Sequence, residues 1–178
     1  HGHMMKVGYD MYARLLKEAV AELKGQKAEQ RVVAELDVDV EAFAPDDYIP
    51  VQSERIDFYR RLAGCGSIEE IASVAAQVQE VYGSMPRPVQ NLVSVARLKL
   101  LASSAGVSKV VVRPGRGELV FAQKQYMMNK KVFDALAESG DRVSPSSSGY
   151  SLVFSSSDYL QKNRLMQAIE EFLVKLQN

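Results

Sequence analysis

Carboxylates and lysines are the side chains that could carry chemistry in this sequence, because the other common catalytic types are scarce. The only two histidines, His1 and His3, stand in a leading His-Gly-His-Met segment that is typical of an expression tag. Without histidine, the chain can form neither a Ser-His or Cys-His nucleophile pair nor a histidine-containing zinc site. The sequence also lacks a G-x-x-x-x-G-K-[ST] phosphate loop and a G-x-G-x-x-G motif. Catalysis is therefore not predicted for this domain.

The clearest row of carboxylates lies at residues 35–42, where acidic and apolar residues alternate. This alternation predicts a half-buried strand with the acids on one face. Carboxylate oxygens suit hard cations, but neighbours on one strand face lie about 7 Å apart, too far to converge on one ion without other ligands. We therefore favour a solvated or edge-protecting acidic face and expect no metal or other cofactor in the domain. A carboxylate enzyme using Asp37, Asp39 or Glu41 is the weakest alternative.

The composition is that of a soluble globular protein and indicates an intracellular setting. Hydrophobic residues make up 47% and charged residues 25% of the 178 residues, close to the averages for folded domains. No apolar run approaches the length of a membrane-spanning helix. Cys65 is the single cysteine, which excludes an internal disulfide and favours the reducing cytoplasm.

Charge is balanced overall but unevenly distributed. Residues 37–57 hold seven acids and one arginine, whereas residues 84–131 hold nine bases and one glutamate. The two segments could be neighbours in the fold, with ordinary solvated charge on their surfaces. Alternatively, the basic segment could bind nucleic acid, with Tyr126 as a stacking platform. The basic residues of this alternative are Arg113, Arg116, Lys124, Lys130 and Lys131.

Helical spacing of apolar residues dominates the chain as far as residue 105. It predicts a helix over residues 10–24, a second one capped by Ser53 that buries Ile56, Tyr59 and Leu62, and further helices over residues 67–83 and from about residue 89. Ser67 and Glu70 form a capping-box pattern at the start of the 67–83 helix. One face of that helix is apolar, and its opposite, exposed face carries Glu69, Ser73, Gln77 and Glu80.

Past Gly106 the pattern changes to short strands. "VSKVVVR" and "ELVFAQK" flank "PGRG", which predicts a hairpin. Asn129 is expected to cap a helix that ends at Gly140, followed by the strand "YSLVF" and a last helix from about Asp158. We therefore predict an α+β fold, with amphipathic helices packed on small antiparallel sheets. Residues 1–5 are the tag and start, and residues 6–178 form one domain with a helical part (6–105) and a hairpin and helix part (106–178).

Several long stretches resemble one known family. "VGYDMYARLLKEAVAELKG", "VDVEAFAPDDYIPVQSERIDFYRRLA" and "VQEVYGSMPRPVQNLVSVARLKLLASSAGVSKV" are similar, in this order, to the C-terminal (TRCF) domain of bacterial transcription-repair coupling factor. The resemblance extends from about Gly8 to Leu176. It implies a regulatory fragment of a large DNA translocase that displaces stalled RNA polymerase and recruits UvrA for nucleotide excision repair. The translocase motors, with their ATP and magnesium, would lie in other domains.

The resemblance also implies a partner and a contact face. In the family this domain has no catalysis of its own, and it packs on the N-terminal UvrB-like module of the same protein. There it covers the UvrA-docking surface and restrains the motor. The contact includes acids at the end of the helix that precedes an Arg-Phe-Gly sequence. Here that sequence is Val81-Tyr82-Gly83, and the acidic positions fall on Gln77 and Glu80, so one carboxylate is retained and one is replaced by an amide.

Overall fold

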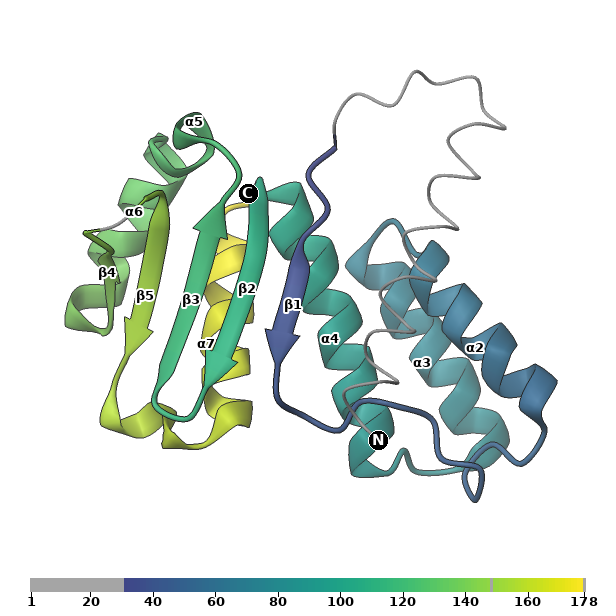
Figure 1. The fold of residues 1–178 in the computed structure, drawn as a ribbon. Helices are drawn as coiled ribbons and strands as arrows, with labels where there is room; N and C mark the ends of the chain where they lie inside the picture. The colour runs from purple at the N-terminus through teal and green to yellow at the C-terminus, as the bar shows by residue number, and fades with distance from the viewer. Residues whose placement is uncertain (1–30, 148, 178) are drawn as a thin grey trace. The chain divides into compact units, whose positions relative to one another are not determined.

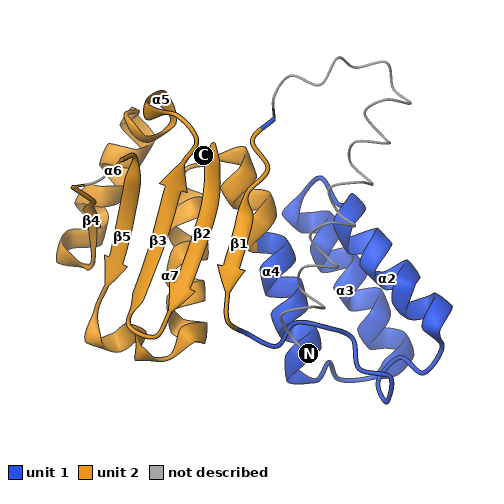
Figure 2. Ribbon diagram, viewed as in Figure 1, with its two compact units in different colours: residues 1–31, 40–97 blue, residues 32–39, 98–178 orange. Residues whose placement is uncertain are grey.

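The computed structural model describes residues 31–147 and 149–177, and the predicted helix over residues 10–24 lies outside them (Figure 1). The chain divides into two compact units (Figure 2). Unit 1 comprises His1–Arg31 and Val40–Arg97, and unit 2 comprises Val32–Asp39 and Leu98–Asn178. The division falls before the predicted one at residues 105/106, and a short segment from early in the chain joins the second unit. The prediction that residues 6–178 form one domain stays a prediction.

Unit 1 contains helices α2 (Gln52–Gly64) and α3 (Ile68–Tyr82) and the part of α4 (Arg87–Ser104) up to Arg97. The predicted cap of α2 is wrong, because Val51 occupies the N-cap position without a side-chain bond and Ser53 lies inside the first turn. Arg55 fixes this end instead. Its Nη1 donates to the carbonyl oxygens of Ile49 and Pro50, at 2.6 and 3.1 Å.

The buried stripe of α2 also differs from the prediction. Phe58 and Leu62, four residues apart, are buried together with Ala63, whereas Ile56 is 41% exposed. Tyr59 is only half-buried, and its hydroxyl accepts a hydrogen bond from the amide of Ala44 at 2.8 Å. A tyrosine ring that packs inward has to keep its hydroxyl hydrogen-bonded. The phenylalanine ring of Phe58 has no polar atom, so it can be buried completely.

Helix α3 begins as the capping pattern predicts. The Ser67 hydroxyl oxygen accepts from the Glu70 amide at 3.2 Å, and the Glu70 carboxylate accepts from the amide of Gly66 at 2.7 Å. The first bond satisfies a donor that the first turn of a helix leaves unpaired, whereas the Glu70 carboxylate reaches the amide of Gly66, one residue before the cap, rather than the amide of Ser67 itself. The apolar face is buried as predicted through Ile71, Val74, Ala75 and Val78, whereas Tyr82, expected on the same face, is only half-buried.

Unit 2 contains one five-stranded sheet with the order β1-β2-β3-β5-β4. Strands β2 and β3 form the predicted hairpin, with Gly115 at φ +78° in the Pro114–Gly115 turn, where a Pro-Gly pair favours positive φ. The α+β class is confirmed, but β1 and β2 run parallel rather than as part of a hairpin. Parallel neighbours need a long connection, and here α2–α4 supply it. The strands are β1 (Glu35–Val38), β2 (Val107–Arg113), β3 (Arg116–Phe121), β4 (Val143–Pro145) and β5 (Ser151–Ser155).

The helices of unit 2 cover one face of this sheet (Figure 1). They are the end of α4, α6 (Lys130–Ser139) and α7 (Lys162–Lys175). The short helix α5 (Lys124–Met127) lies beyond the end of β3, and the 3₁₀ turns are η1 (Gly140–Arg142) and η2 (Ser157–Leu160). Asn129 caps α6 as predicted. Helix α7 approaches β3 closely at Gly117, where a Cβ atom would lie 2.9 Å from the Ile169 side chain. The apolar residues at helical spacing in α7 and at its C-cap are all buried: Leu165, Met166, Ile169, Phe172, Leu173 and Leu176.

Three details of unit 2 depart from the prediction. The last α-helix begins at Lys162 rather than near Asp158, because Ser156 caps the 3₁₀ turn η2 before it. The short elements α5 and β4 had no sequence signal.

Within the described residues, no helix combines the length and apolar character needed to cross a membrane.

Candidate docking face

The outer face of α3 is polar and exposed. Glu69, Ser73, Gln77 and Glu80 are all exposed, while the opposite side of the helix is buried in unit 1. Because these four residues recur at intervals of three or four, they form one stripe along the helix. We call this stripe the α3 face. Its exposure agrees with the sequence pattern, whereas its role in binding stays a prediction.

The two candidate contact residues on the α3 face differ in their freedom. Arg61 of α2 donates from Nη2 to the Gln77 side-chain oxygen, and the Gln77 nitrogen donates to the Ser73 hydroxyl at 3.4 Å. Glu80 has no hydrogen-bond or ion-pair partner in the part of the chain that the structure describes. The carboxylate of Glu80 is thus available to a partner, whereas the amide of Gln77 is already engaged within the unit.

The end of α3 is held by the segment between Pro45 and Pro50. The Tyr48 hydroxyl donates to the carbonyl oxygen of Gly83 at 2.8 Å, and the rings of Tyr48 and Tyr82 lie 5.8 Å apart between centroids. The Tyr82 hydroxyl donates to the Glu54 carboxylate at 2.5 Å. This hydrogen bond raises the pKa of Tyr82, and burial raises the pKa of Tyr48. The last turn of α3 therefore has a fixed support.

Beside Glu80, the last turn of α3 also presents an apolar side chain. Val81 is 71% exposed, the most exposed of the large hydrophobic residues in the described ranges. A free carboxylate next to an exposed aliphatic group can contact a surface that is both basic and apolar.

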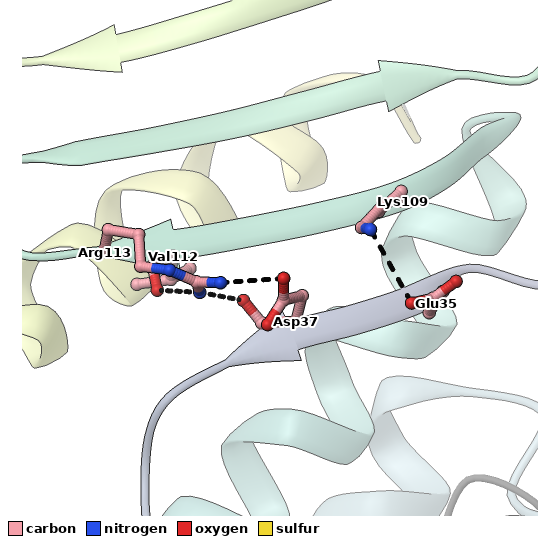
Figure 3. Close-up of polar contacts among 5 residues, drawn as sticks. All are labelled: Glu35, Asp37, Lys109, Val112 and Arg113. Atoms are coloured by element: carbon pink, nitrogen blue, oxygen red, sulfur yellow. Dashed lines mark hydrogen bonds and ion pairs between the residues drawn. The ribbon is translucent and has the colours of Figure 1, made fainter. Parts of the chain in front are cut away.

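In unit 2, two acids of β1 lie beside two bases of β2 (Figure 3). Glu35 lies 3.7 Å from the Lys109 ammonium group, and Asp37 lies 2.8 Å from the Arg113 guanidinium. Arg113 also donates to the backbone carbonyl oxygens of Asp37 and Val112, at 2.9 and 3.0 Å. This contact joins the acidic and basic segments of the sequence, as the first interpretation of the charge asymmetry predicts.

Asp39 and Glu41, which the alternating pattern places on the same strand face, lie beyond the end of β1. Asp39 forms an ion pair with Lys162 of α7 at 2.9 Å. Glu41 is exposed, and its carbonyl oxygen accepts from the Asn91 side chain at 2.9 Å. The strand is thus shorter than its alternating pattern suggests, since it ends at Val38.

The five basic residues of the nucleic-acid alternative form two groups. Arg113 and Arg116 flank the hairpin turn, whereas Lys124, Lys130 and Lys131 belong to α5 and α6, which follow the other end of β3 (Figure 1). Lys130 pairs with Asp134 at 2.6 Å. The ring of Tyr126 packs on Gly106, where an added Cβ would lie 2.3 Å from the ring. One face of the predicted stacking platform is therefore covered.

Sequence reasoning missed the residues that support the α3 face. The sequence pattern did not single out Arg61, and it predicted neither the hydrogen bond from Tyr48 to Gly83 nor the one from Tyr82 to Glu54. Pro45 and Pro50 bracket a turn around Tyr48, but they give no sign of its contact with a helix that ends 34 residues after Tyr48. Such long-range contacts leave no local periodicity.

Comparison with known proteins places the chain in a family. The family model described as the TRCF domain matches residues 38–132, more than half of the chain. The chain belongs to the TRCF domain family. A solved structure, the crystal structure of the C-terminal domain of transcription-repair coupling factor, has the same fold, with a TM-score of 0.72 at 19% identity. The superposition covers 82% of this chain and 92% of that chain.

Curated relatives of this TRCF domain are transcription-repair-coupling factors. That of Mycobacterium bovis is 38% identical over 120 residues, which cover 61% of this chain and 10% of the relative. That of Bacillus subtilis is 33% identical over 62% of this chain and 9% of the relative, and that of Escherichia coli is 29% identical over 71% and 11%. The chain thus spans about a tenth of the length of the relatives it matches.

Proposed function

We propose that this TRCF domain is a non-catalytic, autoinhibitory interaction module. Its parent would be an ATP-driven DNA translocase that displaces stalled RNA polymerase and recruits UvrA for nucleotide excision repair. The domain would pack on the N-terminal UvrB-like module of the same protein, cover the surface that UvrA binds and restrain the motor. ATP and magnesium would act in motor domains outside this chain, so the isolated chain is expected not to hydrolyse ATP.

The observation that carries this proposal is the end of the α3 face. Glu80 is exposed and has no partner among the described residues, Val81 beside it is exposed, and the Tyr48 and Tyr82 contacts hold the turn in place. A preorganised contact loses less conformational entropy on binding than a mobile one. In the proposed complex, the Glu80 carboxylate meets a basic group on the UvrB-like module.

Charge reversal at Glu80 tests the proposal. Glu80→Lys replaces attraction with repulsion, and juxtaposed like charges cost several kcal/mol at an interface. We expect affinity for the isolated N-terminal module to fall at least tenfold, measured by calorimetry at low and moderate salt. Glu171→Lys on α7 makes the same change in charge at an exposed site of unit 2 and is the control. Equal binding by folded Glu80→Lys and by the wild type would exclude the α3 face.

A second variant uses the pair between Arg61 and Gln77. Gln77→Glu restores the second carboxylate that the family carries, but it also places that group beside Arg61. We expect only a small gain in affinity from Gln77→Glu alone, because the new carboxylate pairs within the unit. Adding Arg61→Ala should release the new carboxylate and strengthen docking.

In the full-length parent, Glu80→Lys should raise basal ATPase activity and UvrA binding together, since both would be restrained by one contact.

A further inference from the structure

Strand β1 is a short edge strand inserted into unit 2 from elsewhere in the chain. It has four residues, and β2 is its only partner among the described strands. Arg31, just before this segment, and Val40, just after it, both belong to unit 1. The strand is therefore covalently connected on both sides to residues of the other unit. Its attachment within unit 2 comes from the ladder with β2, from buried Leu36 and Val38, and from charge.

The charged attachment consists of three acid–base pairs at every second residue, Glu35–Lys109, Asp37–Arg113 and Asp39–Lys162. Two of the basic side chains, those of Arg113 and Lys162, also donate hydrogen bonds to backbone carbonyl oxygens of this segment. Arg113 donates to the Asp37 carbonyl oxygen at 2.9 Å, and Lys162 donates to the Asp39 carbonyl oxygen at 2.7 Å. The pairs lie at the surface, with at least one substantially exposed member each, so salt will screen them.

We propose that β1 is a releasable strap whose attachment is gated by these three acid–base pairs. When it detaches, β2–β5 and α5–α7 remain folded, because the other strands pair with one another and α7 packs on β2 and β3 independently of β1. Local openings of this kind occur below the free energy of global unfolding and involve contiguous elements. Release uncovers the edge of β2, whose backbone groups on that side then lose their partners in β1. The strap does not depend on the docking role proposed for α3.

Amide hydrogen exchange on the full chain tests the strap directly. The amides of β1 should exchange faster than those of β3, and a rise from low to high salt should accelerate exchange at β1 selectively. Asp37→Asn combined with Asp39→Asn should increase β1 exchange by roughly fivefold, the range expected for removal of two exposed ion pairs. Glu138→Gln, which breaks the exposed Lys175–Glu138 pair between α6 and α7, is the matched control and should leave β1 exchange unchanged.

Two results would overturn the strap. Exchange at β1 that equals exchange at β3 and does not respond to salt would mean that β1 opens only by global unfolding. An equal acceleration at β1 and β3 in the double variant would mean that the ion pairs stabilise the whole unit rather than the strand. The salt series on the wild-type chain decides the matter even if the double variant fails to fold.

Discussion

Tyr82 connects α3 to α2 through one hydrogen bond, to Glu54. This bond predicts how the stability of the folded chain depends on pH. The Glu54 carboxylate accepts the phenolic proton and raises the pKa of Tyr82 in the folded chain. Above pH about 10, tyrosines of the unfolded chain release their protons while folded Tyr82 retains its own. The folded state then binds more protons, so the free energy of unfolding falls as pH rises through this range.

Tyr82→Phe should therefore make this alkaline loss of stability shallower. The measurement is the urea midpoint between pH 8 and pH 11, followed by circular dichroism. Tyr150→Phe removes an exposed tyrosine from unit 2 and is the control, since it changes the tyrosine count equally. Identical pH profiles for the wild type and Tyr82→Phe would show that the bond to Glu54 does not persist in solution.

Cys65 gives a second residue-scale prediction, about reactivity. Burial raises the pKa of its thiol, with a further contribution from the Glu70 carboxylate, and the thiol donates to the carbonyl oxygen of Arg61 at 3.1 Å. Thiolate is the reactive form, so the native chain should react slowly with a disulfide reagent at pH 8, and urea should accelerate the reaction strongly. A native rate equal to that of the unfolded chain would contradict the burial of this side chain.

At the scale of elements, the start of α3 can be separated experimentally from the start of α2. Ser67 caps α3 through its hydroxyl, whereas Ser53 makes no capping bond in α2. Ser67→Ala should lower the free energy of unfolding by about 1 kcal/mol, the usual loss for an N-cap hydroxyl. Ser53→Ala, the matched control, should change it by less than about 0.5 kcal/mol, as most surface substitutions do. Equal effects in chemical denaturation would mean that one of the two helices begins elsewhere.

The same elements show what could be predicted from sequence. Local features were predicted correctly. They are the caps at Ser67 and Asn129 and the turn at Pro114–Gly115, each of which depends on residues at most three positions apart. The pairing of β1 with β2 joins residues more than 70 positions apart, and alternation reveals a strand's faces but not its neighbour. The three-residue strand β4 and the single turn of α5 are too short to show a period.

The candidate site was predicted to a similar degree. The exposure of Glu80 followed from the helical period, because Val78 and Tyr82 mark the inner side of α3. The engagement of Gln77 by Arg61 did not follow, since it depends on how α2 and α3 pack. On α3, local sequence thus predicted which side chains face outward, and tertiary packing decided which of them remain free.

At the scale of the whole molecule, the distribution of charge argues against tight binding of DNA. The chain has 22 basic and 22 acidic residues. Its candidate cations form one group at the β2–β3 turn and another beyond the other end of β3, and Arg113 is already paired with Asp37. Affinity for duplex DNA grows with the number of phosphates that one surface neutralises together, so separated and partly paired cations contribute little.

We therefore expect the isolated chain to bind duplex DNA no more tightly than about 10 µM at 150 mM salt, within the range of non-specific binding. Fluorescence anisotropy over a salt series measures both the affinity and the number of phosphates contacted. If binding is weak and non-specific, Arg113→Glu and Lys131→Glu, one from each group, should reduce it to a similar extent. Submicromolar affinity with a steep salt dependence, abolished by one of these variants only, would show that one group forms a true nucleic-acid surface. In that case the basic segment, rather than the α3 face, would be the first place to look for the domain's partner.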